Sequence, residues 1–193
     1  VEETHRLISV LARSQPERQR NRAILETLYS RGLRVSELVN LKLSDLYFDE
    51  GFIKVEGKGS KQRLVPISPR AINEIKLYFT DRNRIEVKKE YEDFVFVSQR
   101  RGKGLSRIMI FHMIKELAQT AGIIKNISPH TFRHSFATHL LEGGANLRAI
   151  QCMLGHESIA TTEIYTHIDR NMLRSEIIEH HPRNIKYRKE KER

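Results

Sequence analysis

Apolar side chains recur three or four residues apart over most of the chain, the spacing that places them on one face of a helix. Residues that start helices precede these runs, and glycine ends several of them, as Gly143 does after the run that Ser128 opens. Predicted helices begin at or near Thr4, Glu17, Val35, Pro69, Ser106, Ser128, Asn146, Ser158 and Asp169. The helix from Ser158 holds Tyr165, and the helix from Asp169 carries an apolar stripe. The pattern predicts a largely helical protein.

The period changes to two in the first half of the chain. Residues 52–56 and 62–66 alternate apolar and polar side chains, which is typical of short half-buried strands. The glycine-rich turn at 57–61 joins them, so we predict a β-hairpin with Lys58 at a basic tip. Residues 45–48 are a candidate third strand. The expected fold is therefore mainly α with a small antiparallel β-sheet, of the α+β class.

Charge and cysteine content narrow the possible partners. Lysine and arginine outnumber aspartate and glutamate by 34 to 24, a formal net charge of +10. This excess either covers a solvated surface or binds a polyanion such as nucleic acid, and we favour the polyanion. No apolar run is long enough to span a membrane, and no basic amphipathic helix with exposed aromatics stands out. Because Cys152 is the only cysteine and no signal pattern opens the chain, we expect a cytoplasmic setting.

The 193 residues are enough to bury a good core as one domain, which we expect to cover residues 1–181. Residues 182–193 are densely charged, so we expect a basic, disordered tail able to touch a DNA backbone. The sequence does not begin with methionine, from which we expect a fragment of a longer protein.

The candidate chemistry gathers in the second half of the chain. Tyr165 stands nine residues after His156, on a short helix among small polar residues. His130 and Arg133 share the first turn of a helix, where free N–H groups and the helix dipole favour a phosphate. Taken alone, the pair is better explained by an ordinary capped helix with an exposed histidine and arginine. His130 and His134 are four apart, but no further ligand completes a metal site.

Two cations in the first half of the chain could join this group. Arg34 opens a helix after Gly32, and Glu37, three residues on, could hold its guanidinium. Lys58 sits between two glycines, so its turn is slim enough to enter a groove and deliver an ammonium to a phosphate. Each residue alone could also be an ordinary solvated side chain.

The motifs together resemble the tyrosine recombinase, or phage integrase, family, and most closely its bacterial Xer-type site-specific recombinases. The resemblance extends from about residue 4 to residue 182. It rests on Gly32-Leu33-Arg34-Val35-Ser36-Glu37-Leu38, Gly57-Lys58-Gly59, His130-x-x-Arg133, Leu154-Gly155-His156 and Tyr165. Each motif is weak by itself, but five in order are specific. The amino-terminal helical domain with which such enzymes complete a clamp around DNA is not in this sequence.

The resemblance implies a catalytic domain that cleaves and rejoins DNA through a 3′-phosphotyrosyl intermediate and a Holliday junction. It implies as catalytic residues Arg34, Lys58, His130, Arg133, His156 and Tyr165. It implies no metal, ATP or other cofactor, and a homo- or hetero-tetramer on DNA formed by exchange of the carboxyl-terminal helix. The DNA target, an activating partner, and the choice between chromosome-dimer resolution and mobile-element integration stay open. A non-catalytic DNA-binding regulator and a type IB topoisomerase are the alternatives.

Overall fold

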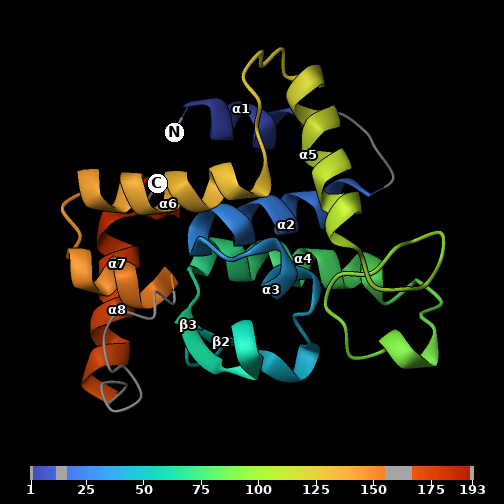
Figure 1. Ribbon diagram of the computed structural model, residues 1–193, viewed down its shortest axis with the longest axis horizontal. Helices are drawn as coiled ribbons and strands as arrows, with labels where there is room; N and C mark the ends of the chain where they lie inside the picture. The colour runs from blue at the N-terminus through green and yellow to red at the C-terminus, as the bar shows by residue number, and fades with distance from the viewer. Residues whose placement is uncertain (1, 12–16, 155–166, 192–193) are drawn as a thin grey trace.

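The computed structural model describes residues 2–11, 17–154 and 167–191, which form a mainly helical body with one small sheet (Figure 1). The helices are α1 (Glu2–Val10), α2 (Arg18–Arg31), α3 (Val35–Val39), α4 (Pro69–Arg82), α5 (Arg107–Thr120), α6 (Pro129–Glu142), α7 (Leu147–Leu154), α8 (His167–His180) and α9 (Pro182–Lys191). The strands are β1 (Leu46–Tyr47), β2 (Phe52–Glu56) and β3 (Gln62–Pro66). The predicted fold class is confirmed.

The sheet is antiparallel and has the strand order β1-β2-β3. In its register Ile53 pairs with both Leu46 and Val65, so the predicted hairpin and third strand are both present. The turn between β2 and β3 holds Lys58, and Gly59 adopts a φ of 72° there. That left-handed conformation suits glycine and allows the turn to be tight.

Helix α2 lies between α4 and α6 and forms the centre of the main core (Figure 1). Its residues Ile24, Leu25 and Leu28 are fully buried, as the helical spacing predicts. A second apolar cluster joins α6, α7 and α8 through side chains that include Phe136, Ile150, Met153, Leu173 and Ile177. The end of α2 meets this second cluster, because Gly32, which follows α2, lies against Phe136 and Leu154.

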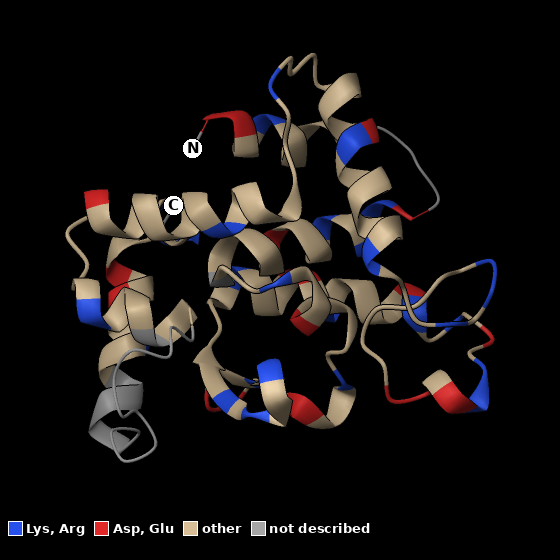
Figure 2. Cartoon of the chain, viewed as in Figure 1, with Lys and Arg blue, Asp and Glu red and all other residues tan. Residues whose placement is uncertain are grey.

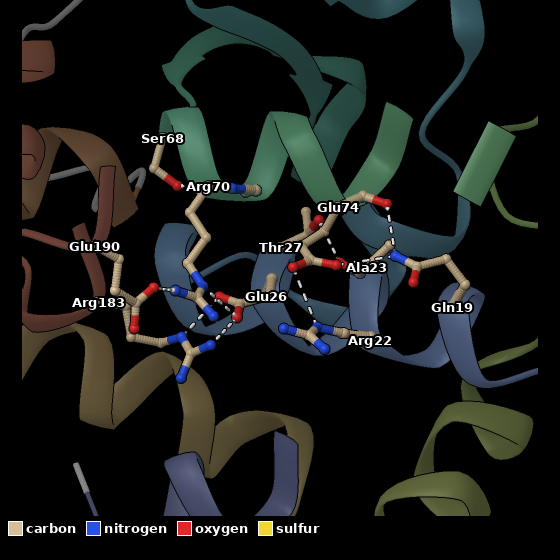
Figure 3. Close-up of polar contacts among 11 residues, drawn as sticks. Gln19, Arg22, Ala23, Glu26, Thr27, Ser68, Arg70, Glu74, Arg183 and Glu190 are labelled. Carbon is tan, nitrogen blue, oxygen red and sulfur yellow. Dashed lines mark hydrogen bonds and ion pairs between the residues drawn. The ribbon is translucent and has the colours of Figure 1, made fainter. Parts of the chain in front are cut away.

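The prediction of a disordered tail is wrong for residues 182–191, which form α9. Arg183 is only 5% exposed, and its Nε donates to Glu26 Oε2 at 2.9 Å across the molecule. Arg70 of α4 donates to Oε1 of the same carboxylate at 3.0 Å (Figure 3). Charge density indicated disorder because sequence alone does not reveal that a buried carboxylate on α2 neutralises one of the tail's cations.

Three smaller predictions also change. Helix α1 begins at Glu2, so Thr4 lies inside it and does not cap it. Helix α8 begins at His167, and Asp169 is therefore within its first turn. Along α8, Leu173 and Ile177 are buried while Met172 is 45% exposed, so the predicted stripe is only partly a core face. Within the described part of the chain, every helix is too short or too polar to traverse a lipid bilayer.

Candidate active site

Arg34 is placed by the abrupt end of α2. Gly32 ends that helix with a φ of 59°, and its N–H donates to the Leu28 carbonyl at 3.0 Å. Two residues later Arg34 stands in extended conformation directly before α3. Its side chain is 43% exposed, and its Nη1 lies 3.5 Å from Glu37 Oε1. The expected contact between Glu37 and this guanidinium is therefore present, but it is long.

Gly32 also allows α2 to approach α6 and α7 closely. A Cβ atom at this position would lie 2.5 Å from Phe136 Cδ1 and 2.8 Å from Leu154 Cδ2. Both distances are shorter than a van der Waals contact allows, so only glycine fits without movement of its neighbours. The glycine of the Gly32-Leu33-Arg34 motif is thus required by packing as well as by its backbone angle.

Arg133 is buried and connects the two halves of the site. Its Nη1 donates to the Gly32 carbonyl at 2.9 Å, and its Nη2 donates to the Leu154 carbonyl at 2.5 Å. Gly32 precedes the segment that carries Arg34, and Leu154 precedes the segment that carries His156. Arg133 therefore ties together the backbone on both sides of the site, and its guanidinium has further N–H donors.

The electrostatics of Arg133 indicate a cluster of like charges. Burial first, and then the neighbouring Arg34 and Arg63 guanidinium groups, lower the pKa of Arg133 to about 10, against the opposing effect of Glu37. At this pKa the side chain still carries its charge at neutral pH. In the described part of the site, the cations Arg34, Arg63 and Arg133 therefore face one buried carboxylate, Glu37.

Lys58 and Arg34 line one groove. It has a volume of about 950 Å³ and runs between α3 and the hairpin, with Lys54 and Gln62 also in its wall. Lys58 is exposed at the tip, as predicted. Figure 2 shows further lysine and arginine positions on the hairpin, on α5 and on the loops beside α4. The groove and its surroundings are thus rich in cations.

His130 lies on the first turn of α6, after the N-cap Ser128, and is exposed. The Ser128 N–H donates to the Thr131 hydroxyl oxygen at 3.1 Å, which fixes the start of the helix. Within residues 2–11, 17–154 and 167–191, no hydrogen bond or ion pair joins His130 to Arg34, Lys58 or Arg133. The structure thus places His130 one turn from Arg133, with no hydrogen bond or ion pair between the two among the described residues.

His156 and Tyr165 lie outside the described residues, so their roles stay predictions. The described chain ends at Leu154, which Arg133 holds, and resumes at His167, where α8 begins. The predicted short helix from Ser158 is likewise outside the described part.

Sequence reasoning missed Arg63. Its Nη1 and Nη2 donate to Glu37 Oε1 and Oε2 at 2.7 and 3.1 Å, a bidentate ion pair in the wall of the site. A signal was available, because Arg63 pairs with buried Val55 and shares a strand face with buried Val65. An arginine on the apolar face of a strand needs a buried anion, and Glu37 is that anion.

This arrangement, an arginine pair and a lysine on a basic helical domain, defines a site suited to a phosphate group. The chain belongs to the phage integrase family, whose model matches residues 1–172. It is 51% identical over 164 residues to tyrosine recombinase XerD of Chlorobaculum tepidum, which covers 85% of this chain and 54% of that protein. The resemblance to tyrosine recombinases is confirmed.

Solved structures agree with the family assignment. A XerA recombinase is 37% identical with a TM-score of 0.72, over 94% of this chain and 64% of that one. The XerH site-specific recombinase bound to difH substrate, in a pre-cleavage complex, is 31% identical with a TM-score of 0.69. That match covers 86% of this chain and 49% of the XerH chain. The chain spans little more than half the length of the curated relatives it matches.

Proposed function

We propose that residues 1–181 form the catalytic domain of a site-specific tyrosine recombinase, a DNA strand transferase that needs neither metal nor ATP. The observation that carries the proposal is the pair Arg34 and Arg133, held beside the groove that Lys58 lines. Clustered guanidinium groups repel one another, and a bound phosphodiester would relieve that repulsion. Helix α9 packs against α4 and α8 of the same body, so we extend the proposed domain beyond the predicted residue 181 to residue 191.

The proposed reaction uses these cations to stabilise charge on the scissile phosphate. Enzymes remove on the order of 8–23 kcal/mol from reaction barriers, which requires a preorganised cluster and not one side chain. Arg34 and Arg133 donate to the non-bridging oxygens, and His156 adds a hydrogen bond as charge builds. The remaining groups move protons and form the covalent bond.

In the proposed cleavage step the Tyr165 hydroxyl oxygen attacks phosphorus, and the bond to the 5′ oxygen breaks. Lys58 gives its proton to that leaving oxygen, while His130 assists removal of the tyrosine proton or orients the phosphate. A 5′-hydroxyl from the partner strand then attacks the 3′-phosphotyrosyl bond, which rejoins the DNA and releases Tyr165. The bond energy stays in the adduct, so no external energy source is required.

The proposed partner is a double-stranded recombination site, bound by a homo- or hetero-tetramer that exchanges its carboxyl-terminal helices. The XerH relative bound to its difH substrate supports DNA as the partner. Chromosome-dimer resolution and mobile-element integration are both proposed roles for this recombination. Sequencing of DNA crosslinked to the whole protein would identify the target.

A nicked suicide substrate tests the proposed function, because loss of a short 5′ fragment traps the covalent intermediate. The unaltered protein is expected to form a DNA adduct that survives denaturing electrophoresis. Tyr165→Phe should bind the DNA and form none, because it lacks the nucleophilic oxygen. Tyr47→Phe, which alters an exposed tyrosine on β1, is the matched control and should react normally.

Adduct formation by Tyr165→Phe would remove that residue from the role. DNA binding without any adduct by the unaltered protein would favour the non-catalytic regulator. Relaxation of supercoils without junction formation would favour the topoisomerase.

A further inference from the structure

Arg63 is a cation on the inner face of the sheet, close to the proposed phosphate site. Its side chain is 11% exposed and lies opposite Val55 in the β2–β3 register. Burial of a guanidinium is unfavourable unless hydrogen bonds and an opposite charge compensate it. Glu37 provides both, because its side chain is 1% exposed and both its oxygens accept from Arg63, at 2.7 and 3.1 Å.

The same carboxylate also faces Arg34. Glu37 Oε2 accepts from the Arg34 backbone N–H at 3.0 Å, and Oε1 lies 3.5 Å from Arg34 Nη1. The contact with Arg63 Nη1 is shorter, at 2.7 Å to that same Oε1. Glu37 is therefore fully paired with Arg63 and only loosely paired with Arg34, whose side chain stays 43% exposed on the groove.

The pairing of Arg63 with Glu37 determines whether the Arg34 guanidinium stays in the groove. A buried carboxylate that lost Arg63 would carry an uncompensated charge, and the nearest remaining cation is Arg34. The guanidinium of Arg34 would then close onto Glu37 and its charge would be taken from the groove. With Arg63 in place, one guanidinium neutralises the carboxylate and the other keeps its charge for an anion.

We propose that Arg63 is a positioning residue, which neutralises Glu37 and so keeps the Arg34 guanidinium directed at the scissile phosphate. The inference rests on the proposed function of the site. Arg63 touches no substrate atom in this role and acts through Glu37 and Arg34.

A competing explanation is that Arg63 acts on the site through Lys58 at the tip of the hairpin. A Cβ at Gly57 would lie 3.4 Å from Arg63 Nη1 and 3.7 Å from Glu37 Oε1, so the base of the Lys58 turn rests on this ion pair. If this contact is what matters, loss of Arg63 displaces Lys58 and not Arg34. The two routes differ in the substrate that restores activity, which makes them separable.

The test measures cleavage by Arg63→Gln on three suicide substrates with an ordinary phosphodiester, a neutral methylphosphonate or a 5′-phosphorothiolate at the scissile position. On the ordinary substrate we expect a loss on the order of 10-fold or more, below that for removal of a direct donor. The neutral methylphosphonate needs less charge compensation, so on this substrate Arg63→Gln should cleave nearly as fast as the unaltered protein. Arg34→Ala should regain cleavage on the same substrate. The phosphorothiolate, whose sulfur leaves without a proton, should rescue Lys58→Ala but not Arg63→Gln.

Rescue of Arg63→Gln by the phosphorothiolate would overturn the proposal, because Arg63 would then act through Lys58. Equal loss on all three substrates would also overturn it, as a general structural effect. The matched control is Arg22→Gln, which breaks a pair with buried Glu74, where Arg22 Nε lies 3.1 Å from Glu74 Oε1 (Figure 3). Neither residue lines the groove. This variant should have a lower melting temperature, but its relative cleavage rates on the three substrates should match those of the unaltered protein.

If Arg63→Gln does not fold, the double variant Arg63→Gln/Glu37→Gln removes the uncompensated carboxylate and takes its place in the assay. This variant should cleave with a smaller defect than Glu37→Gln combined with Arg34→Ala, since Arg34 remains free to act. Parity between those two double variants would contradict the proposal. Failure of the unaltered protein to form an adduct on any substrate would instead overturn the proposed function.

Discussion

At the residue scale, the protein repeatedly pairs a buried glutamate with one or more arginines. Among the described residues, Glu26, Glu37 and Glu74 are at most 5% exposed. Arg183 and Arg70 compensate the first, Arg63 and Arg34 the second, and Arg22 the third. A buried charge without such partners would shift its pKa and become neutral. The pairings therefore decide which arginines stabilise the fold and which keep their charge for a ligand.

Replacement of Gly32 tests how closely α2 meets α6 and α7. Gly32→Ala should lower the free energy of unfolding by about 2–4 kcal/mol, since it combines overpacking with a strained left-handed backbone. Chemical denaturation measures this loss. Gly59→Ala is the control, because Gly59 shares the positive φ but a Cβ there meets nothing within 4 Å. It should cost only about 1 kcal/mol. Equal losses would show that packing at Gly32 is unimportant.

His5 predicts a pH dependence of stability. Burial first, and then Arg183 and Lys186 of α9, lower the pKa of His5 from its ordinary 6.5 to about 4, against the opposing effect of Glu26. Between about pH 4 and pH 6.5, the His5 imidazole therefore binds a proton in the unfolded chain but not in the folded one. The contribution of neutral His5 is thus complete above pH 6.5 and is lost as the pH falls towards 4.

The measurement compares melting temperatures of the unaltered protein and His5→Asn from about pH 7 to pH 5. The melting temperature of the unaltered protein should fall more over this range, because only that protein has the His5 titration. Carboxylate titrations affect both proteins alike. His112→Asn alters an exposed histidine on α5 and should keep the steep dependence. A slope unchanged in His5→Asn would contradict the assignment.

At the element scale, local sequence signals predicted most helices and strands. They failed for α9, whose packing depends on a charged partner far away in the sequence. Helical spacing and caps located α2, α4, α5, α6 and α7, and the Asn146 Oδ1 accepts from the Arg148 N–H at 2.9 Å as a cap should. Alternation and glycines located the hairpin because both signals are local. Helix α9 was missed, since its burial depends on Glu26, 157 residues away from Arg183.

The docking of α9 makes a prediction about Arg183. Arg183→Met leaves the fully buried Glu26 with Arg70 as its remaining partner, which should cost about 1–3 kcal/mol in unfolding free energy. Glu190→Gln removes the ion pair in which Arg70 Nη1 lies 3.6 Å from Oε2 of the exposed Glu190, and should cost at most about 0.5 kcal/mol. Urea titrations of both variants give the comparison. Similar effects would mean that the Glu26 cluster does not anchor α9.

At the scale of the whole molecule, α2 connects the proposed site with the carboxyl-terminal helix. Glu26 binds Arg183 of α9, and Gly32, at the end of the same helix, accepts from Arg133. Six residues of α-helix span about 9 Å, so the two contacts are close together. A change in the position of α9 would therefore act on an element that also supports the site.

The sequence placed the exchanged carboxyl-terminal helix from Asp169 onwards, but α9 is the last helix of the described residues, so deletion of residues 182–193 tests the proposed exchange. On DNA with two adjacent sites the deletion should weaken cooperative assembly more than binding to a single site, because it removes the exchanged element. Lys186→Gln/Lys189→Gln is the control, since it lowers the charge of α9 and keeps the helix. Gel-shift titrations on one-site and two-site DNA distinguish the two effects. Unchanged cooperativity in the deletion would count against the exchange.

The amino-acid sequence by itself determined the local elements, the basic character and the set of motifs that marks the family. These features depend on short spacings and on composition, which are complete in the chain before it folds. Only the tertiary structure decided that Arg133 holds Gly32 and Leu154, that Arg63 neutralises Glu37, and that Glu26 anchors α9. Periodicity reports which face of an element is apolar, whereas the partner of a buried charge depends on which elements pack together.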